Sequence, residues 1–421
     1  MHYKSILNFF LLFIGIYTGA RAQDTTQKIT LNRINATTQE QKPYVILISI
    51  DGFRYDYRKI YHANHLNKLA ENGVAAQSMY PSFPSITFPN HYTIVSGLYP
   101  AHHGLIGNDI YDSATNSRYS LGNAKAVKNP YWYGGTPLWV LAEKQQMLSA
   151  SFYWPGSEAP IQNTLPTYYY AYNEKIPIAS RIQTVVNWLE LPAEKRPHFI
   201  TFYFPQVDHA GHKFGPKSKE TKSAVAFVDS SINALNDAVQ KTGLPVNFIV
   251  VSDHGMTQLK ENNPLHLPFQ VDSTSETIVS NGSLVDIFVP NPTKRDSLYK
   301  ELQLKKKHFE VYYKNELPED YHYRTSDDRY HRIGDIVLVA HAPFYFSNHK
   351  KTIAGSHGFY VKETPDMQAT FLAWGPAFKS GITIPSFTNI EIFPLIADIL
   401  GLKYDPNSID GKDILAKEIL K

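Results

Sequence analysis

Continuous apolar runs and helical patterns alternate along this chain. The clearest run, residues 44–50, is apolar at almost every position and ends at Asp51. A run that is apolar on both faces is typical of a buried strand in a parallel sheet. Further strands are predicted at residues 198–204, 247–251, 335–340 and 369–374. Patterns with a helical period predict helices at residues 65–72, 136–145, 179–189, 218–241 and 390–400.

This alternation predicts an α/β fold, a doubly wound and mostly parallel sheet with helices on both faces. Residues 260–349 break the pattern with many charged and tyrosine residues, which indicates a small α+β insertion beside the active site. Residues 23–42 are polar, rich in Thr and Gln and without periodicity, so we expect a flexible lead-in. The folded domain is then predicted to span residues 43–421.

The first 22 residues have the layout of a secretory signal peptide. Lys4 precedes an apolar run over residues 7–17, and Ala20-Arg21-Ala22 is a small-x-small cleavage site. The run is too short to span a bilayer, and no other stretch approaches ~20 apolar residues, so no transmembrane segment is expected in the mature chain. The chain has no cysteine, which favours a bacterial periplasmic or secreted protein over a eukaryotic secreted one.

Net charge and composition limit the classes of molecule that the protein is expected to bind. The net charge of +3 is small and dispersed, so binding of a nucleic-acid polymer or an anionic membrane is not indicated. A small anionic substrate remains possible, because bound metals can supply the positive field. The absence of cysteine also removes thiolates from the candidate metal ligands and nucleophiles.

Acidic residues follow three of the predicted strands. Asp51, Asp208 and Asp253 lie just after the runs at 44–50, 198–204 and 247–251, at the edge where ligands bind in such sheets. Singly, each is as typical of a turn as of a metal site. Three histidines beside glycines complete the set: His212, His254 and His357. Three Asp and three His are enough for two divalent metals, and this mixture suits Zn²⁺, with Mn²⁺ or Fe as alternatives.

Thr87 is a candidate nucleophile. It lies in Pro84-Ser-Ile-Thr-Phe-Pro89, where the prolines indicate a rigid turn and Thr87 is expected to open a helix. A helix-capping threonine is the structural alternative. The same geometry would place backbone N–H groups around an anion, and a neighbouring metal would lower the pKa of the hydroxyl.

Several motifs in order along the chain resemble those of one family, the nucleotide pyrophosphatase/phosphodiesterase family of the alkaline phosphatase superfamily, in a bacterial single-domain type. They are Ile-Asp-Gly-Phe-Arg at 50–54, Thr-Phe-Pro-Asn-His-Tyr at 87–92, Ser-Gly-Leu-Tyr-Pro-Ala-His-His-Gly at 96–104, Val-Asp-His-Ala-Gly-His at 207–212, Ser-Asp-His-Gly-Met at 252–256 and Gly-Ser-His-Gly at 355–358.

The resemblance implies an alkaline-phosphatase-like fold with two Zn²⁺ ions per chain. One ion is implied on Asp208, His212 and His357. The other is implied on Asp51, Asp253 and His254, with Thr87 facing it as ligand and nucleophile. Asn108 matches a family residue that donates a hydrogen bond to a phosphoryl oxygen.

The implied activity is a zinc-dependent hydrolysis of nucleotide phosphodiester or pyrophosphate bonds through a phosphothreonine, releasing a nucleoside monophosphate. Phe88 and Tyr203 match positions that sandwich the base of a nucleotide in relatives, although both could simply pack in the core. Related monoesterases place Lys-x-Arg where this chain has Trp154-Pro-Gly-Ser157, which resembles the diesterase branch.

Three alternatives remain open at this stage. The chain could cleave phospholipid or choline phosphodiesters, or it could be an alkaline phosphomonoesterase. A metal-dependent nucleotide-binding protein without turnover is the non-enzyme alternative, but binding alone does not need the Thr87 nucleophile.

Overall fold

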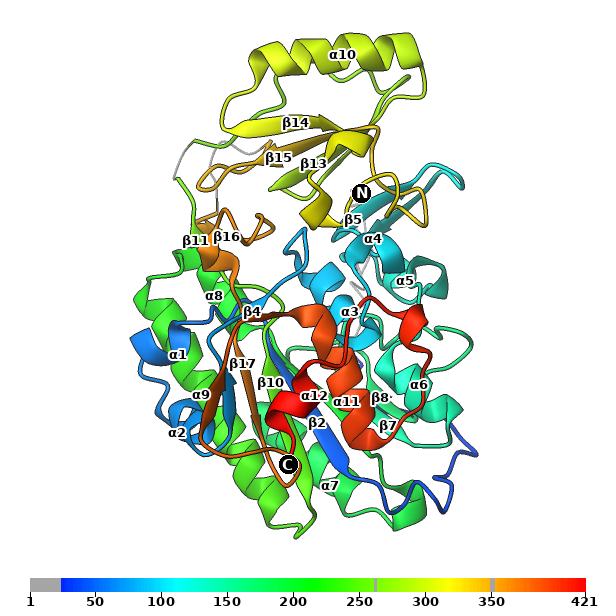
Figure 1. Ribbon diagram of the computed structural model, residues 1–421, viewed down its shortest axis with the longest axis vertical. Coiled ribbons are helices and arrows are strands. Elements are labelled where there is room, and N and C mark those ends of the chain that lie inside the picture. The colour runs from blue at the N-terminus through cyan, green and yellow to red at the C-terminus, as the bar shows by residue number, and fades with distance from the viewer. Residues whose placement is uncertain (1–23, 261–262, 349–352) are drawn as a thin grey trace, which may run out of the picture.

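The computed structural model describes residues 24–260, 263–348 and 353–421, so the predicted signal peptide lies outside the described residues (Figure 1). A nine-stranded mixed sheet forms its centre. The strands of this sheet are β1 (Gln27–Ile29), β2 (Tyr44–Ile50), β3 (Val74–Ala76), β7 (Ser149–Phe152), β8 (Tyr168–Tyr170), β9 (Phe199–Phe204), β10 (Val246–Val251), β17 (Phe371–Trp374) and β18 (Ile382–Ile384).

The strand order is β1-β8-β7-β9-β2-β10-β17-β3-β18. The central strands β8, β7, β9, β2 and β10 run parallel to one another, whereas β1 runs antiparallel to β8 and β17 runs antiparallel to both β10 and β3. The mostly parallel sheet expected from the apolar runs is therefore confirmed. Because β2 lies between β9 and β10, the three strands that precede the candidate acidic residues are adjacent.

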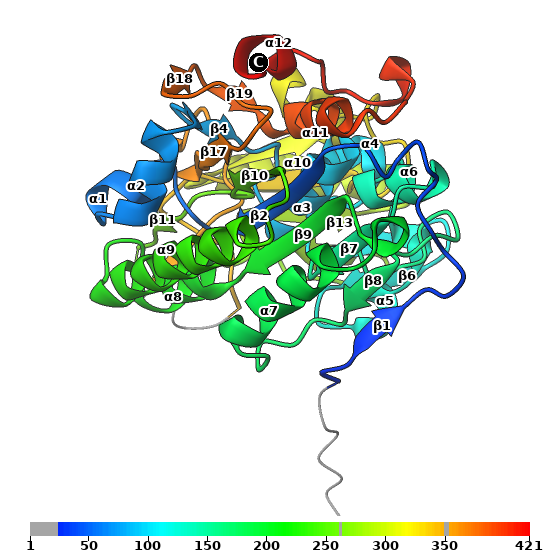
Figure 2. The ribbon, with the colours of Figure 1, turned by 90° about the horizontal axis from the view of Figure 1, so that it is seen from below.

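Helices cover both faces of this sheet (Figure 2). They are α1 (Tyr57–Ile60), α2 (Asn64–Glu71), α3 (Thr87–Ser96), α4 (Pro100–His103), α5 (Ala124–Val127), α6 (Leu138–Lys144), α7 (Ile178–Leu189), α8 (Gln206–Phe214), α9 (Lys219–Gln240), α10 (Pro292–Lys305), α11 (Ile392–Leu400) and α12 (Leu415–Ile419). All five predicted helices are present as α2, α6, α7, α9 and α11. Among the described helices, none combines the length and the apolar character needed to cross a membrane.

The side chains of β2 explain why its sequence is apolar throughout. Val45 and Leu47 belong to a core cluster shared with α3, α6 and α11. Ile46 and Ile48 point the other way, into a cluster shared with α2, α7 and α9. Alternate residues of a strand face opposite sides of a sheet, so a strand covered on both sides is apolar at every position.

The lead-in is a correction to the sequence analysis. The predicted flexible segment 23–42, described from residue 24 on, contains β1, which pairs antiparallel with β8. The buried Asn35 amide donates to the carbonyls of Ala193 and Arg196, and its oxygen accepts the Leu148 N–H. These partners lie more than 100 residues away, so no local pattern in the lead-in indicates them.

The predicted α+β insertion is a second, antiparallel sheet covered by α10 (Figure 1). Its order is β12 (Thr277–Ser280), β13 (Leu284–Phe288), β15 (Ile336–Ala340) and β14 (Phe309–Tyr313). The strand predicted at 335–340 is thus β15, in this sheet and not in the central one. Val285 and Ile287 of β13 pack against Leu298 and Leu302 of α10 in a core of its own. The exact domain limits, 43–421 with an insertion at about 260–349, stay predictions.

Three short two-stranded pairs lie outside these two larger sheets. They are β4 (Met79–Tyr80) with β19 (Phe387–Thr388), β5 (Asp109–Asp112) with β6 (Ser117–Ser120), and β11 (Thr257–Gln258) with β16 (Gly355–Ser356). The last two pairs matter for the site, since residues just before β5 and just after β16 belong to it.

Candidate active site

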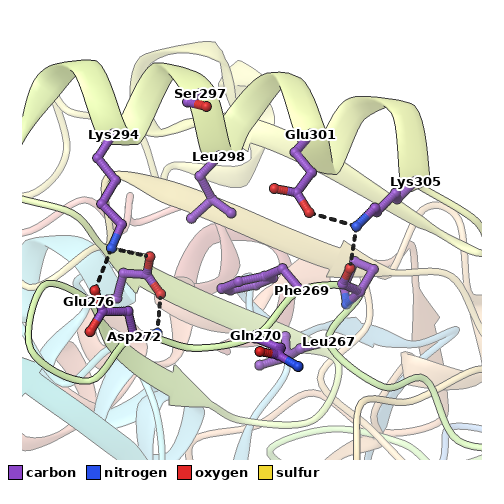
Figure 3. Close-up of a pocket in the computed structure, with 11 residues that line it drawn as sticks. Leu267, Phe269, Gln270, Asp272, Glu276, Lys294, Ser297, Leu298, Glu301 and Lys305 are labelled. Carbon is purple, nitrogen blue, oxygen red and sulfur yellow. Dashed lines mark hydrogen bonds and ion pairs between the residues drawn. The ribbon is translucent and has the colours of Figure 1, made fainter.

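An open groove of about 770 Å³ runs under α10 (Figure 3). The lysines that line it form ion pairs with neighbouring carboxylates. Lys294 is paired with Asp272 at 2.9 Å and with Glu276 at 3.1 Å. Lys305 is paired with Glu301 at 2.6 Å. Both lysines of the groove are thus engaged in ion pairs within the fold, and the candidate Asp, His and Thr residues lie outside it.

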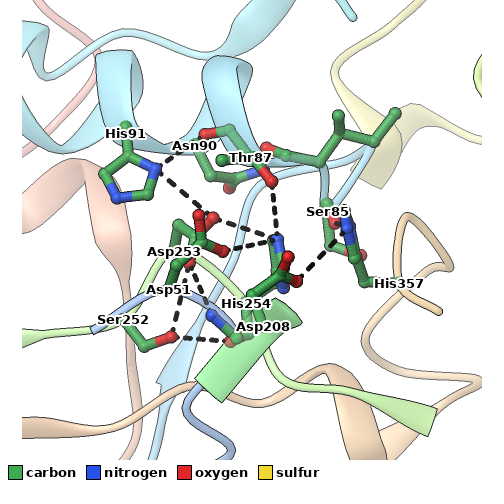
Figure 4. Close-up of polar contacts among 12 residues, drawn as sticks. Asp51, Ser85, Thr87, Asn90, His91, Asp208, Ser252, Asp253, His254 and His357 are labelled. Carbon is green, nitrogen blue, oxygen red and sulfur yellow. Dashed lines mark hydrogen bonds and ion pairs between the residues drawn. The ribbon is translucent and has the colours of Figure 1, made fainter. Parts of the chain in front are cut away.

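The predicted Asp and His residues meet at the carboxyl ends of the central strands, and Figure 4 labels five of the six, all but His212. Asp51 directly follows β2, and Asp253 and His254 follow β10. Asp208 and His212 lie one turn apart on α8, which begins just after β9, and His357 follows β16. Five of the six side chains are buried and His212 is partly exposed.

The first group consists of Asp51, Asp253 and His254, whose ligand atoms all lie within 4.8 Å of one another. His254 Nε2 is 3.0 Å from Asp253 Oδ2 and 3.5 Å from Asp51 Oδ1. These are the three residues that the family resemblance assigns to one metal.

The second group surrounds Asp208. His212 Nε2 lies 3.3 Å from Asp208 Oδ1 and 3.1 Å from His357 Nε2, and His357 Nε2 is 3.8 Å from the same Asp208 oxygen. His254 also comes within 4.8 Å of Asp208 and His357, with its ring stacked on His357 at 3.5 Å. The two groups are therefore contiguous, with His254 between them.

Hydrogen bonds prepare the histidines as metal ligands. The Nδ1 atoms of His212, His254 and His357 donate to the backbone carbonyls of Gly355, Gly255 and Ser85, at 2.8, 2.8 and 3.0 Å. A ring that donates through Nδ1 keeps a lone pair on Nε2, the arrangement typical of metal-bound histidine. The Nε2 lone pairs of His212 and His357, 3.1 Å apart, would repel one another without a cation between them.

Three carboxylate oxygens of the site lack a hydrogen-bond partner within the described residues, and this also fits the binding of metal ions. Asp51 Oδ1, Asp208 Oδ1 and Asp253 Oδ2 are buried without a hydrogen-bond partner. Leaving such an oxygen unsatisfied is costly, so native proteins pair it or use it to coordinate a metal. These oxygens face the free Nε2 atoms, and the donor set fits two divalent cations.

The shifted pKa values of three of these residues also fit a metal site. Burial, together with the charges of Asp253 and Asp208, holds the pKa of Asp51 well above its usual range. Burial alone would raise the pKa of Asp253, but the neighbouring His254 and His91 hold it well below that range. Burial beside His254 and His212 lowers the pKa of His357 well below that of a free imidazole. Divalent cations would offset the negative charge that these carboxylates concentrate.

Thr87 lies beside the first group. It is the first residue of α3, as predicted, and the capping position belongs to Ile86 instead. Its hydroxyl is 3.1 Å from His254 Nε2, and the side chain is partly exposed. The Thr87 hydroxyl thus borders the candidate metal ligands of the first group.

Asn108 comes to the same helix end from a distant loop. Its Oδ1 accepts the Phe88 N–H at 3.1 Å, which leaves the amide NH₂ without a partner in the described part of the chain. The side chain of Phe88 is partly exposed and lies next to Thr87. The structure thus brings Thr87, Phe88 and Asn108 together.

Tyr203 has a different environment from the one expected. Its side chain is only 8% exposed, and its hydroxyl donates to Asp51 Oδ2. The ring packs edge-on against His91 and Tyr172, at 5.3 and 6.0 Å. Packing covers the ring, which favours the alternative that Tyr203 packs in the core over the base stacking that the resemblance implies. The neighbouring Tyr172, 47% exposed, is the aromatic residue here that faces solvent.

His91 is the site residue that the sequence analysis missed. It is fully buried on α3, with Nδ1 at 2.9 Å from the Thr87 carbonyl and 3.3 Å from Asp253 Oδ2. Its Nε2 accepts from Ser49 Oγ at 2.7 Å. The spacing of four residues from Thr87 put it on the same helix face, which is the signal that could have found it.

The comparison with known families decides the relationship. The model of the type I phosphodiesterase / nucleotide pyrophosphatase family matches residues 45–360. The chain belongs to this family. The match spans β2 to the residues just after His357 and confirms the resemblance carried by the motifs.

Relatives of this phosphodiesterase family include a venom phosphodiesterase of Macrovipera lebetinus, 37% identical over 381 residues, 88% of this chain and 44% of that protein. The ectonucleotide pyrophosphatase/phosphodiesterase family member 1 of Mus musculus is 36% identical over 387 residues, 87% of this chain and 42% of that protein. The chain thus spans less than half the length of these relatives.

Solved structures agree on the fold. Murine ectonucleotide pyrophosphatase / phosphodiesterase 5 superimposes with a TM-score of 0.83 at 30% identity, covering 90% of this chain and 100% of that one. An inactive threonine-to-alanine variant of the murine protein, in complex with AMP, matches with the same TM-score at 29% identity. The alkaline-phosphatase-like fold is confirmed.

Proposed function

We propose that this protein is an exported, zinc-dependent phosphodiesterase that cleaves nucleotide phosphodiester or pyrophosphate bonds through a phosphothreonine. The observation that carries the proposal is the Thr87 hydroxyl, 3.1 Å from His254 Nε2 at the start of α3. A binding protein would have no use for a hydroxyl in that position. The predicted signal peptide supports export, as do the names of the venom and ecto-protein relatives.

Two Zn²⁺ ions fit the donor set. Asp51, Asp253 and His254 would hold one, and Asp208, His212 and His357 the other. When bound, such ions lower the pKa of a neighbouring hydroxyl and stabilise the departing oxygen. The nucleophile and the hydrogen-bond donors of the reaction come from side chains and backbone groups of this chain.

The reaction begins with attack of Thr87 Oγ1 on phosphorus. The new Oγ–P bond forms as the bond to the leaving oxygen breaks. The leaving oxygen departs with the electron pair of that bond, and the Thr87 hydroxyl proton passes to solvent. Water then attacks the phosphothreonine from the opposite side, releasing the nucleoside monophosphate and restoring the hydroxyl.

Two donors are available for the charged phosphoryl oxygens. Asn108 Oδ1 accepts the Phe88 N–H, which orients the amide, and the NH₂ group has no hydrogen-bond partner among the residues that the structure describes. The Thr87 N–H lies in the first turn of α3, where backbone donors have no helical acceptor. Donors fixed before the reaction stabilise the transition state without reorganising.

The pocket favours a diester over a monoester. None of the ion pairs of the six ligand residues involves Lys or Arg within the described chain, so a dianionic phosphate gains no extra cation. Where related monoesterases carry Lys-x-Arg, this chain has Trp154, whose Nε1 donates to the His91 carbonyl at 3.0 Å. Phe88 and the exposed Tyr172 offer ring faces to a base, and stacking contributes ~1–3 kcal/mol per base.

The decisive test compares two substrates of zinc-reconstituted protein, p-nitrophenyl thymidine 5′-monophosphate and p-nitrophenyl phosphate. We expect kcat/KM to be higher for the diester by roughly 10²-fold or more, the size of effect that a lost charge contact gives. A preference for the monoester would make the protein a phosphatase. No turnover of either would leave the binding alternative.

A further inference from the structure

One side chain of the insertion reaches the loop that carries Asn108. Asn281 lies in the turn between β12 and β13, and its Oδ1 accepts the N–H groups of both Asn108 and Asp109 at 3.0 Å. Its Nδ2 donates to the Asp109 carbonyl, also at 3.0 Å. The carboxamide thus uses its acceptor and its donor on the backbone of two consecutive residues, 172 or 173 positions away.

The loop is shaped to admit this side chain. A Cβ atom added to Gly107 would lie 2.6 Å from Asn281 Nδ2, closer than side-chain contacts come. Glycine at 107 therefore permits the amide to reach the backbone. Asparagine is the residue of this length that offers a carbonyl and an NH₂ group together, so it suits both the two donors and the acceptor.

The turn that holds Asn281 is itself held on several sides. Asn281 N–H donates to the Leu284 carbonyl and the Gly282 carbonyl accepts from Phe346 N–H, each at 2.8 Å. Gly282 has a φ of +80°, and a Cβ there would overlap the Tyr345 ring at 1.8 Å. The turn is thus packed against the rest of the insertion, and Asn281 is held at a rigid point.

These contacts connect Asn281 to Asn108, whose NH₂ group is proposed to donate to a phosphoryl oxygen. Asn281 holds the backbone of Asn108, and Asn108 Oδ1 holds the Phe88 N–H next to Thr87. Displacing Asn108 would turn its NH₂ group away from the reacting centre. Misplacement of a catalytic donor by about 1 Å is enough to cost up to ~10²-fold in rate.

We propose that Asn281 is a positioning residue, through which the insertion aligns the Asn108 amide with the transition state. The inference rests on the proposed function, since it takes Asn108 as the donor to a phosphoryl oxygen. Asn281 itself touches only the backbone of residues 108 and 109 and acts through them.

The test is a double-mutant cycle with Asn281→Ala and Asn108→Ala, assayed on p-nitrophenyl thymidine 5′-monophosphate. We expect Asn108→Ala to lower kcat by ~10²-fold and Asn281→Ala by roughly 10-fold, both with little change in KM, because the interaction is made in the transition state. In the Asn108→Ala background, Asn281→Ala should change kcat by less than about 2-fold, since its effect passes through Asn108.

Asn291→Ala is the matched control. Asn291 is another asparagine of the insertion, and it accepts the Lys294 N–H at 3.0 Å as the cap of α10. It should cost stability without changing kcat. Hydrogen exchange gives an independent readout: the amides of residues 108 and 109 should exchange faster in Asn281→Ala and unchanged in Asn291→Ala.

The outcomes separate the two proposals. If Asn108→Ala lowers kcat but Asn281→Ala is without effect, or lowers it equally in both backgrounds, the positioning role is wrong and the proposed function stands. If Asn108→Ala leaves diester turnover unchanged, the assignment of Asn108 fails and the positioning role falls with it.

Discussion

At the scale of single residues, the site is defined by atoms that the fold leaves free. In each candidate ligand histidine, Nδ1 donates to a backbone carbonyl, so that Nε2 can bind a metal. Each candidate ligand aspartate has one buried oxygen without a hydrogen-bond partner among the described residues. The sequence predicted these residue types from their place after apolar runs. It could not choose between Tyr203 in β9 and Tyr172 just after β8, because only the folded structure shows that their rings are in contact and which of them is exposed.

Thr87→Ala should abolish diester turnover, lowering kcat by roughly 10³-fold or more, as removal of a nucleophile does. Because the Thr87 side chain forms a single hydrogen bond within the described residues, to His254, zinc content and folding should be nearly unchanged. Thr87→Ser keeps a hydroxyl and should retain most of the activity. Steady-state kinetics with zinc analysis on the three proteins checks this; unchanged turnover by the Ala variant would contradict the covalent route.

At the scale of helices and strands, the spacing of apolar residues predicted an element correctly where the burial of that element's own residues determined its structure. The amphipathic pattern at 179–189 is α7, and the apolar run at 44–50 is β2. It was misleading for β1, a short edge strand whose partner β8 is far away in sequence. Edge strands bury little, so their sequence carries no strong alternation.

Asn35→Ala tests whether this N-terminal segment contributes to stability. The change removes three hydrogen bonds that join the segment to β7 and to the loop before β9, and it leaves buried groups unsatisfied. We expect a loss of about 2–4 kcal/mol in the free energy of unfolding. Gln41→Ala, at an exposed position of the same segment, should change it by less than ~0.5 kcal/mol. Urea unfolding compares the two, and equal small effects would mean that the segment is dispensable.

At the scale of the whole molecule, the metal ligands come from segments distant in sequence. They follow β2, β9, β10 and β16, and the parallel order β9-β2-β10 brings three of these ends together. The insertion adds Asn281 to the loop of Asn108, so both sheets contribute to one site. A bound metal would therefore stabilise contacts across the entire fold.

Removal of the metals should affect activity and stability together. Dialysis against a chelator should abolish turnover and lower Tm, and added Zn²⁺ should restore both. A ligand at 100 times its Kd contributes ~2.7 kcal/mol per site to folding. Asp51→Asn should show a smaller rise in Tm on adding Zn²⁺ than the parent protein. Full activity and an unchanged Tm after exhaustive chelation would rule out the metal sites.

The sequence by itself determined the fold class, the central strands and helices, and the residue types of the site. It could do so because burial on both faces of a sheet imposes apolar runs and because metal chemistry requires Asp and His. Only the tertiary structure decided which side chains meet. His91 beside Asp253, Tyr203 on Asp51 and Asn281 on the Asn108 loop depend on contacts between segments far apart in the chain. Such contacts arise from how strands and turns are arranged in space, which no local pattern records.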